Sequence, residues 1–216
     1  MHVLIINGSP RTKKLSNTDK ILTMFTKGMR ENGTTFEQYE VSDRKQWDTM
    51  RKAFAENQNI LIALPLYVEN IPGLLLEFLA TVTPKTNGSH ISFILQGGFA
   101  EGIQLRCGED YLKMLAERLG CTYCGTFAKG DNFAIRFIEK EQSEKITAPY
   151  AEMGREYASN GGFNSDKCRK FTGPELLPAP MRLFVSIMFR TAAKRSLKKV
   201  AAGLGCTKPL DDQPYS

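Results

Sequence analysis

The chain has few of the residues on which metal and triad chemistry most often depend. Its 216 residues include only two histidines, His2 and His90, which leaves little for a histidine metal site or a histidine-dependent catalytic triad. The five cysteines are odd in number and scattered along the chain, a usage typical of a reducing compartment and not of a disulfide framework. We therefore expect neither a metal centre nor a disulfide-stapled domain.

Long hydrophobic runs are also missing. The uncharged apolar runs, such as residues 60–68 and 71–76, are far too short to span a bilayer. The first residues indicate a strand and lack the basic and hydrophobic regions of a signal peptide. Hydrophobic residues make up 42% and charged residues 24% of the chain, as in ordinary folded proteins. We expect a cytoplasmic protein built on one main domain.

Acidic residues are absent from residues 176–210, which hold seven lysines and arginines. Because the formal net charge of the whole chain is +6, the remainder is close to neutral. Within residues 181–202, Phe184, Ile187 and Met188 share one helical face broadly opposite several basic side chains, which predicts a basic amphipathic helix. Such a helix could make peripheral contact with an anionic membrane or touch nucleic acid. We favour packing on the main domain or a partner subunit and do not expect nucleic-acid binding.

The first 130 residues alternate between strand-like and helical spacing. Strands are predicted at residues 2–7, 35–41, 59–66, 91–95 and 123–128, with helical segments between them. This alternation indicates right-handed crossovers and a parallel sheet. Apolar and aromatic side chains recur at helical spacing over residues 146–157, which predicts a further helix. Pro149 either starts this helix or kinks it. We divide the chain into a main domain, residues 1–160, and a C-terminal extension, residues 161–216.

The sharpest motif follows the first strand. Gly8-Ser9-Pro10-Arg11 is followed by Ser16-Asn17-Thr18, which opens a helix. A helix N-terminus offers free backbone N–H groups and the positive end of the helix dipole. Arg11 adds a guanidinium group, whose paired N–H donors suit phosphate oxygens. The pattern suits a single terminal phosphate; the plainer interpretation is a turn and a helix capped by Ser16 or Asn17.

Two further loops follow the third and fourth strands. Pro65-Leu66-Tyr67-Val68 leads to Pro72-Gly73, and Gln96-Gly97-Gly98-Phe99 is rich in glycine, which permits close backbone approach to a ligand. Each loop alone is equally compatible with ordinary turn structure. With the strands in the order 2-1-3-4-5, however, all three loops lie side by side at the carboxyl edge of the sheet, where ligands bind in open parallel sheets.

These three motifs, in this order, resemble the flavodoxin-like NADPH-dependent FMN reductase family over roughly residues 1–130. Its Gly-Ser-x-Arg phosphate loop is similar to Gly8–Arg11, its Pro-x-Tyr loop to Pro65–Tyr67, and its glycine-rich loop to Gln96–Gly98. The resemblance implies an α/β, doubly wound, five-stranded parallel sheet with a C-terminal helical extension. It also implies bound FMN, with NADPH or NADH as reductant. Placement of FMN at the switch point of such a sheet is the general rule for flavodoxin itself.

The resemblance implies a role for thirteen residues. The phosphate would be held by Ser9, Arg11, Ser16, Asn17 and Thr18, and the isoalloxazine would be flanked by Pro65, Leu66, Tyr67, Val68, Gln96, Gly97, Gly98 and Phe99. We name no catalytic side chain, because the flavin carries the chemistry. The expected activity is transfer of electrons from a nicotinamide cofactor through FMN to a small-molecule acceptor, in a homo-oligomer such as a dimer. The alternative is a flavodoxin-type electron carrier without nicotinamide activity.

Three local features of the sequence predict further properties of this chain. Residues 74–79 are unusually apolar where relatives often carry charges, which predicts a covered surface. The segment 42–59 contains no cysteine, which excludes the compact cluster of the related iron–sulfur flavoproteins. Cys121 and Cys124 enter a predicted strand on opposite faces and too far apart for a disulfide, so we expect structural thiols.

Overall fold

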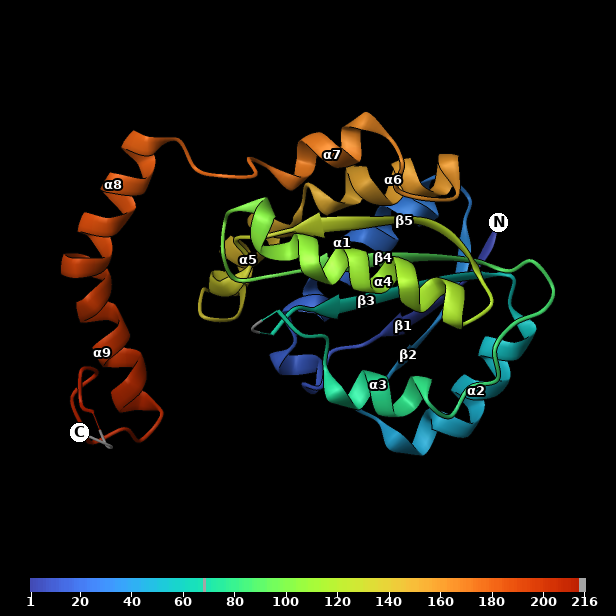
Figure 1. The fold of residues 1–216 in the computed structure, drawn as a ribbon, viewed down its shortest axis with the longest axis horizontal. Coiled ribbons are helices and arrows are strands. Elements are labelled where there is room, and N and C mark those ends of the chain that lie inside the picture. The colour runs from blue at the N-terminus through green and yellow to red at the C-terminus, as the bar shows by residue number, and fades with distance from the viewer. Residues whose placement is uncertain (68, 214–216) are drawn as a thin grey trace. The chain divides into compact units, whose positions relative to one another are not determined.

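Five parallel strands form the centre of the fold in the computed structural model, which describes residues 1–67 and 69–213. The strands are β1 (His2–Asn7), β2 (Thr35–Glu40), β3 (Asn59–Pro65), β4 (His90–Gln96) and β5 (Thr122–Lys129). Their order is β2-β1-β3-β4-β5, and every neighbouring pair is parallel (Figure 1). The predicted flavodoxin-like sheet is therefore confirmed, with strand boundaries close to those expected from the sequence.

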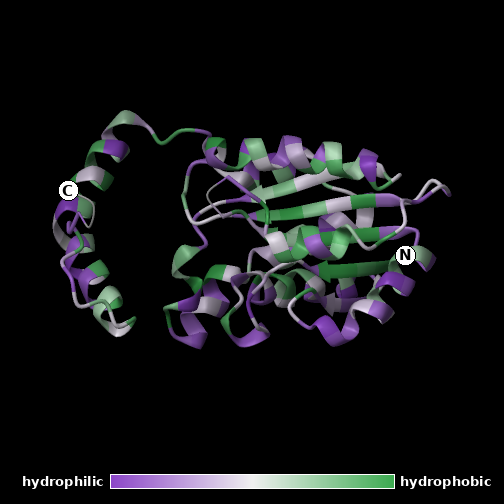
Figure 2. Ribbon diagram, turned by 60° about the horizontal axis from the view of Figure 1, so that its bottom comes forward, coloured by the Kyte–Doolittle hydropathy of each residue, from purple (hydrophilic) through white to green (hydrophobic). Residues whose placement is uncertain are grey.

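Helices cover both faces of the sheet. The main-domain helices are α1 (Asn17–Glu31), α2 (Trp47–Glu56), α3 (Gly73–Leu79), α4 (Arg106–Arg118), α5 (Lys140–Thr147), α6 (Tyr150–Asn160) and α7 (Asp166–Thr172), with short 3-10 turns η1 (Lys13–Leu15), η2 (Arg44–Gln46), η3 (Gly102–Leu105) and η4 (Phe133–Arg136). One apolar core lies between the sheet and α2, α3 and α4, and a second lies between the sheet and α1 and α6. The central strands are therefore apolar on both sides (Figure 2), which explains their uninterrupted hydrophobic sequence.

Helix α3 owes its apolar composition to the core of its own domain. Leu75 and Phe78 are fully buried and Leu79 is nearly so, and the Phe78 ring packs edge-on against Trp47 at 5.5 Å between centroids. Leu76 is 38% exposed, and Glu77 pairs with Arg44 at the surface. The surface predicted to be covered is thus largely covered by the sheet and by α2, and its composition requires no further partner.

Helices α1 and α6 approach each other through glycine. A Cβ atom at Gly28 would lie 1.9 Å from the carbonyl oxygen of Ala151, and one at Gly154 would lie 1.9 Å from that of Phe25. Both clashes are with backbone, which cannot rotate aside as a flexible side chain would. The close crossing of these two helices therefore depends on both glycines.

We expect Gly154→Ala to lower the free energy of unfolding by about 1–3 kcal/mol, the usual cost of forcing an extra methyl group into a packed interface. Thermal and denaturant unfolding of the flavin-free protein measure this effect. Gly73→Ala is the matched control, because a Cβ atom there meets nothing within 4 Å and alanine favours a helix over glycine. Equal loss of stability in both variants would show that the helix crossing is not the cause.

The two thiols of Cys121-x-x-Cys124 are both free. Cys121 lies in the core beside α4, and burial raises the pKa of its thiol. Cys124 is on β5, with its Sγ atom 3.4 Å from Nδ1 of His90. Burial raises the pKa of Cys124 as well, so both sulfurs favour the protonated form, which is the poor nucleophile.

The chain separates into two compact units, residues 1–175 and 176–216. The first unit therefore includes α7, which the sequence analysis placed in the extension; Cys168 of α7 is buried in the second core. The second unit contains α8 (Ala179–Met188), a π-helical turn η5 (Phe189–Ala193) and α9 (Lys194–Gly203). Among the described residues, no helix has the length and apolar character needed to cross a membrane. Packing of this unit on the main domain or on a partner subunit, and its contact with a membrane, are the alternatives that the sequence leaves open.

Candidate functional site

A cavity of about 270 Å³ opens at the carboxyl edge of the sheet. Its walls come from the ends of β1, β3, β4 and β5 and from the start of α1. The lining residues are Ser9, Arg11, Leu15, Asn17, Thr18, Pro65, Leu66, Tyr67, Gln96, Gly97, Gly98, Asn132, Phe133 and Arg136. The cavity therefore lies where ligands bind in doubly wound sheets, and it brings together residues from all three predicted loops.

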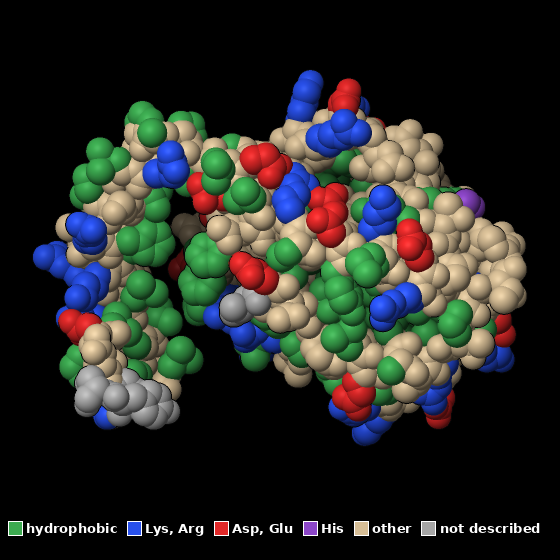
Figure 3. Space-filling model, viewed as in Figure 1, with side chains coloured by type: hydrophobic (Ala, Val, Ile, Leu, Met, Phe, Trp, Pro, Cys, Tyr) green, Lys and Arg blue, Asp and Glu red, His purple; other side chains and the backbone are tan. Residues whose placement is uncertain are grey.

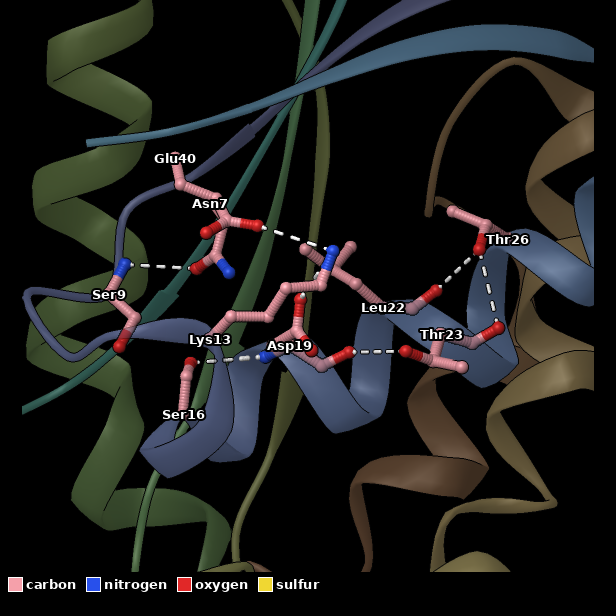
Figure 4. A network of polar contacts seen from close by, with 9 residues as sticks. All are labelled: Asn7, Ser9, Lys13, Ser16, Asp19, Leu22, Thr23, Thr26 and Glu40. Atoms are coloured by element: carbon pink, nitrogen blue, oxygen red, sulfur yellow. Dashed lines mark hydrogen bonds and ion pairs between the residues drawn. The ribbon is translucent and has the colours of Figure 1, made fainter. Parts of the chain in front are cut away.

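The loop after β1 is anchored tightly against the sheet. The Gly8 backbone N–H donates to the carbonyl oxygen of Ala63 at 2.7 Å, and a Cβ atom at Gly8 would approach a methyl carbon of Leu75 to 2.7 Å. The side chain of Asn7 accepts a hydrogen bond from the Ser9 N–H (Figure 4), and the Ser9 hydroxyl accepts one from the Arg11 N–H. Glycine at position 8 thus lets the loop lie close to β3, and the Asx-type turn that follows presents Ser9 and Arg11 to the cavity.

Ser16 has a structural role at the start of α1. Its side chain is fully buried and accepts a hydrogen bond from the Asp19 N–H at 3.1 Å (Figure 4), which is the geometry of a helix N-cap. Ser16 does not line the cavity. Of the two interpretations that the sequence allows for this residue, the capping role is the one that its hydrogen bond supports.

Asn17 and Thr18, the first residues of α1, face the cavity. The Asn17 amide nitrogen donates to the carbonyl oxygen of Asn132 at 2.7 Å, while its Oδ1 atom is buried and has no hydrogen-bond partner among the described residues. Thr18 accepts a bond from the Gln96 side chain at 3.4 Å. A buried acceptor without a partner is costly, so Oδ1 of Asn17 marks a place where a ligand hydroxyl or a water would be bound.

Two carboxylates near the start of α1, those of Asp19 and Glu40, are not part of the cavity lining and face a lysine. The Nζ atom of Lys13 is 3.7 Å from Glu40 and 4.0 Å from Asp19 (Figure 4). Burial raises the pKa of Asp19, while Lys13 opposes that rise. This lysine therefore offsets negative charge that would otherwise repel an anion at the N-terminus of α1.

The loop after β3 is held by backbone hydrogen bonds. The Leu66 N–H donates to the Gln96 carbonyl at 2.8 Å, and Tyr67 and Asn70 exchange two bonds across a tight turn. The Tyr67 hydroxyl accepts a bond from Nε of Arg11 at 3.3 Å, so the second loop touches the first. Pro65, Leu66 and Tyr67 all line the cavity; Val68, the fourth predicted residue of this loop, lies outside the described residues.

The glycine-rich loop after β4 is tied to the loop after β5. The Gly97 N–H donates to the Lys129 carbonyl, and the Gly97 carbonyl accepts from the Asn132 N–H, both at 3.0 Å. Gln96, Gly97 and Gly98 line the cavity. Phe99 is 75% exposed and lines a neighbouring shallow cleft instead. It therefore lies at the rim and not in the cavity wall.

The loop after β5 supplies cavity residues that the sequence reasoning missed. Asn132 is 2% exposed; its side chain donates to the Lys129 carbonyl and accepts from the Tyr150 hydroxyl, both at 2.9 Å. Phe133 and Arg136 complete the wall, and Leu15 adds to it from the turn before α1. A signal was present in the sequence: Gly130-Asp131-Asn132 is a turn at the end of the fifth strand, and every such turn in this fold lies at the same edge.

The cavity is electropositive. Arg11 and Arg136 both line it, and no aspartate or glutamate is among the described lining residues. The Arg136 guanidinium lies 4.4 Å from the Phe137 ring centroid and 5.6 Å from that of Phe133, and its buried Nε atom has no hydrogen-bond partner in the part of the chain that the structure describes. Burial lowers the pKa of Arg136 and the Arg11 charge lowers it further, although an arginine remains protonated. The positive charges of Arg11 and Arg136 repel each other, and a bound anion would stabilise both side chains by accepting their hydrogen bonds.

Comparisons with known proteins agree with this geometry. The family model described as NADPH-dependent FMN reductase matches residues 1–125. No curated protein matches the chain.

Solved structures with the same architecture include three redox enzymes. An FMN-dependent NADH-azoreductase from Bacillus anthracis, solved in complex with FMN, is 16% identical, covers 74% of this chain and 98% of its own, and has a TM-score of 0.55. The apo form of an NADH:FMN oxidoreductase is 14% identical over 80% of this chain and 96% of its own (TM-score 0.56). An NAD(P)H:quinone oxidoreductase from Methanothermobacter marburgensis is 16% identical over 74% and 95% (TM-score 0.54). At these identities the similarity establishes the fold.

Proposed function

Because the chain belongs to the NADPH-dependent FMN reductase family, we propose that it is an FMN-dependent NAD(P)H oxidoreductase that reduces a small acceptor. Bound FMN would accept a hydride from the nicotinamide cofactor and pass electrons on, and this chemistry belongs to the cofactor. The observation that carries the proposal is the cavity with two arginines and no carboxylate among its described lining residues, at the carboxyl edge of a sheet in the order β2-β1-β3-β4-β5.

The phosphate of FMN fits the end of the cavity formed by the loop after β1 and the start of α1. A phosphate monoester carries a charge of about −1.5 to −2 near neutral pH, which Arg11 and Arg136 together would balance. The hydroxyls of Ser9 and Thr18 and the first N–H groups of α1 would supply hydrogen bonds. We assign Ser16 an indirect part, since it fixes the helix start that presents those groups.

The flavin ring would lie between the loops after β3 and β4. Backbone N–H groups in these loops would favour negative charge on the reduced ring, a role that requires no titrating side chain. Two residues of the cavity lining, Tyr67 and Phe133, have exposed aromatic side chains. Since aromatic rings prefer to stack on flat partners, we infer a small planar acceptor, such as a quinone or an aromatic azo compound.

We expect the FMN-loaded protein to lose its visible flavin absorption on a timescale of roughly seconds when NADPH or NADH is added in the absence of oxygen. Enzymes of moderate turnover react at this rate. Stopped-flow absorbance measures this step, and subsequent addition of a quinone should restore the band. Photoreduced protein that passes electrons to a quinone but is not bleached by either nicotinamide over about an hour would be an electron carrier, and the proposed nicotinamide activity would be wrong.

A further inference from the structure

The C-terminal unit contains one long, continuous helix whose side chains are not buried. Helix α8, the π-helical turn η5 and α9 follow one another without a break (Figure 1). None of the described residues in α8 or α9 is buried, and Phe184, Ile187 and Leu183 are each more than half exposed. Such a concentration of exposed apolar side chains is unusual for a surface that stays in water.

The π-helical turn brings the apolar side chains of the two helices onto one face. In a regular α-helix each residue turns by about 100°, so Leu197, nine positions after Met188, would point to the opposite side. A π turn closes i→i+5 bonds and thus holds one residue more than an α turn. With that residue accommodated between 189 and 193, Leu197, Val200 and Leu204 fall within about 80° of Met188, and Phe184 lies within about 40° of Met188 on its other side.

The same shift places three of the four basic side chains of α9 on the other face, while Lys199 falls about 80° from Met188, at the edge of the apolar face. Lys194, Lys198 and Arg195 fall about 120–180° from Met188 by the same spacing. In the space-filling view, lysine and arginine side chains gather on one side of the middle of the helix with hydrophobic ones opposite, whereas hydrophobic side chains occur on both sides near its start (Figure 3). Lys194 pairs with Asp211 and Lys208 with Asp212. The basic residues of this unit that form no ion pair within the described chain are Arg182, Arg190, Arg195, Lys198 and Lys199.

We propose that residues 179–204 bind in the plane of an anionic lipid membrane, with the apolar face in the acyl boundary and the basic side chains at the headgroups. An anionic membrane complements both faces, because apolar burial and attraction of cations act together in interfacial helices. Nucleic acid would match the cations and leave the apolar face in water. A second copy of the helix would cover the apolar face, but its cationic face would have no acidic partner. This inference does not depend on the flavin site.

The test is co-sedimentation of the full chain with vesicles. We expect binding to vesicles containing about 30% phosphatidylglycerol at low salt, at least about tenfold weaker binding to purely zwitterionic vesicles, and clear weakening as salt shortens the range of electrostatic attraction. Arg195→Glu with Lys198→Glu, which both change the basic face, should weaken binding at least about tenfold. Lys27→Glu with Lys113→Glu is the matched control, since it changes the net charge equally at exposed sites of the main domain and should leave binding within about threefold.

Two length variants test the alignment of the apolar face separately from charge. Deletion of Thr191 removes the extra residue of the π turn, so a regular α-helix would keep the apolar residues in line and vesicle binding should persist. Insertion of one alanine after Thr191 turns α9 by about a further 100° and should weaken binding at least about tenfold. Both variants keep every charge, and an unchanged FMN spectrum would show that the main domain is intact.

Several results would overturn the proposal. Binding that is equal for the deletion and insertion variants would show a diffuse electrostatic tail instead of a membrane helix. Failure of the full chain to bind anionic vesicles would remove the lipid partner, and in that case a concentration-dependent dimer abolished by Phe184→Ser would identify the face as an interface between copies. Tighter binding to a nucleic-acid duplex than to vesicles would show that the partner is nucleic acid and not a lipid membrane.

Discussion

Replacing Arg11 and Arg136 together by methionine is expected to weaken FMN binding by about 10²–10⁴-fold while changing riboflavin binding little. Hydrogen bonds to charged groups contribute about 1.5–3 kcal/mol each, and each 1.4 kcal/mol is about tenfold in affinity. Both side chains line a cavity without a carboxylate among its described residues, and Nε of Arg136 is buried without a partner. Fluorescence titration of the flavin-free protein with FMN and with riboflavin measures both affinities.

The single variants and a matched control make this result specific. Each single replacement should lose part of the FMN affinity, and Arg136→Met keeps an unbranched apolar chain between the two phenylalanines. Arg118→Met removes one positive charge from an exposed position on α4 and should leave both affinities unchanged. If wild-type protein bound FMN and riboflavin equally well, neither arginine would hold the phosphate and the assignment of the loop after β1 would be wrong.

Asn132→Ala is expected to lower the free energy of unfolding by about 1–3 kcal/mol, because it leaves the buried Tyr150 hydroxyl without its hydrogen-bond partner. The Lys129 carbonyl loses the bond from Asn132 but keeps the one from the Gly97 N–H. The loss is large against the total stability of about 5–15 kcal/mol usual for a domain. The same change loosens the wall that faces Asn17, so FMN affinity should fall as well. Denaturant unfolding of the flavin-free protein and FMN titration measure the two effects.

Tyr150→Phe is the natural partner variant. It removes the hydroxyl but keeps the ring in the aromatic cluster with Phe127 and Phe171, so it should cost less than Asn132→Ala. The double variant should cost less than the sum of the two single variants, since the bond between them is lost only once. Strict additivity would show that this hydrogen bond contributes nothing to the stability of the cavity wall.

The sequence by itself determined the order of the sheet and most of the cavity. Continuous apolar runs bounded by turn residues are typical of central strands of a parallel sheet, and right-handed crossovers then place the segments after β1, β3 and β4 along one edge. Ten of the thirteen predicted site residues line the cavity for this reason. The strands and their common edge could be predicted because they depend on local periodicity and on chirality, whereas the thirteen residues were assigned through the resemblance of three loop motifs to the reductase family.

The tertiary structure alone decided how the other residues are used. Asn132 and Arg136 join the site because Gly97 pairs with the loop after β5, a contact between distant segments that no local pattern encodes. Ser16 caps α1, because its position relative to the first residue of that helix directs its hydroxyl to the Asp19 N–H. The apolar α3 needed no outside partner once Leu75 and Phe78 met the sheet. In the C-terminal helix, spacing predicted an amphipathic segment, but only the backbone shows the π turn that joins its two apolar faces into one, because a change in hydrogen-bond register leaves no mark in the residue types themselves.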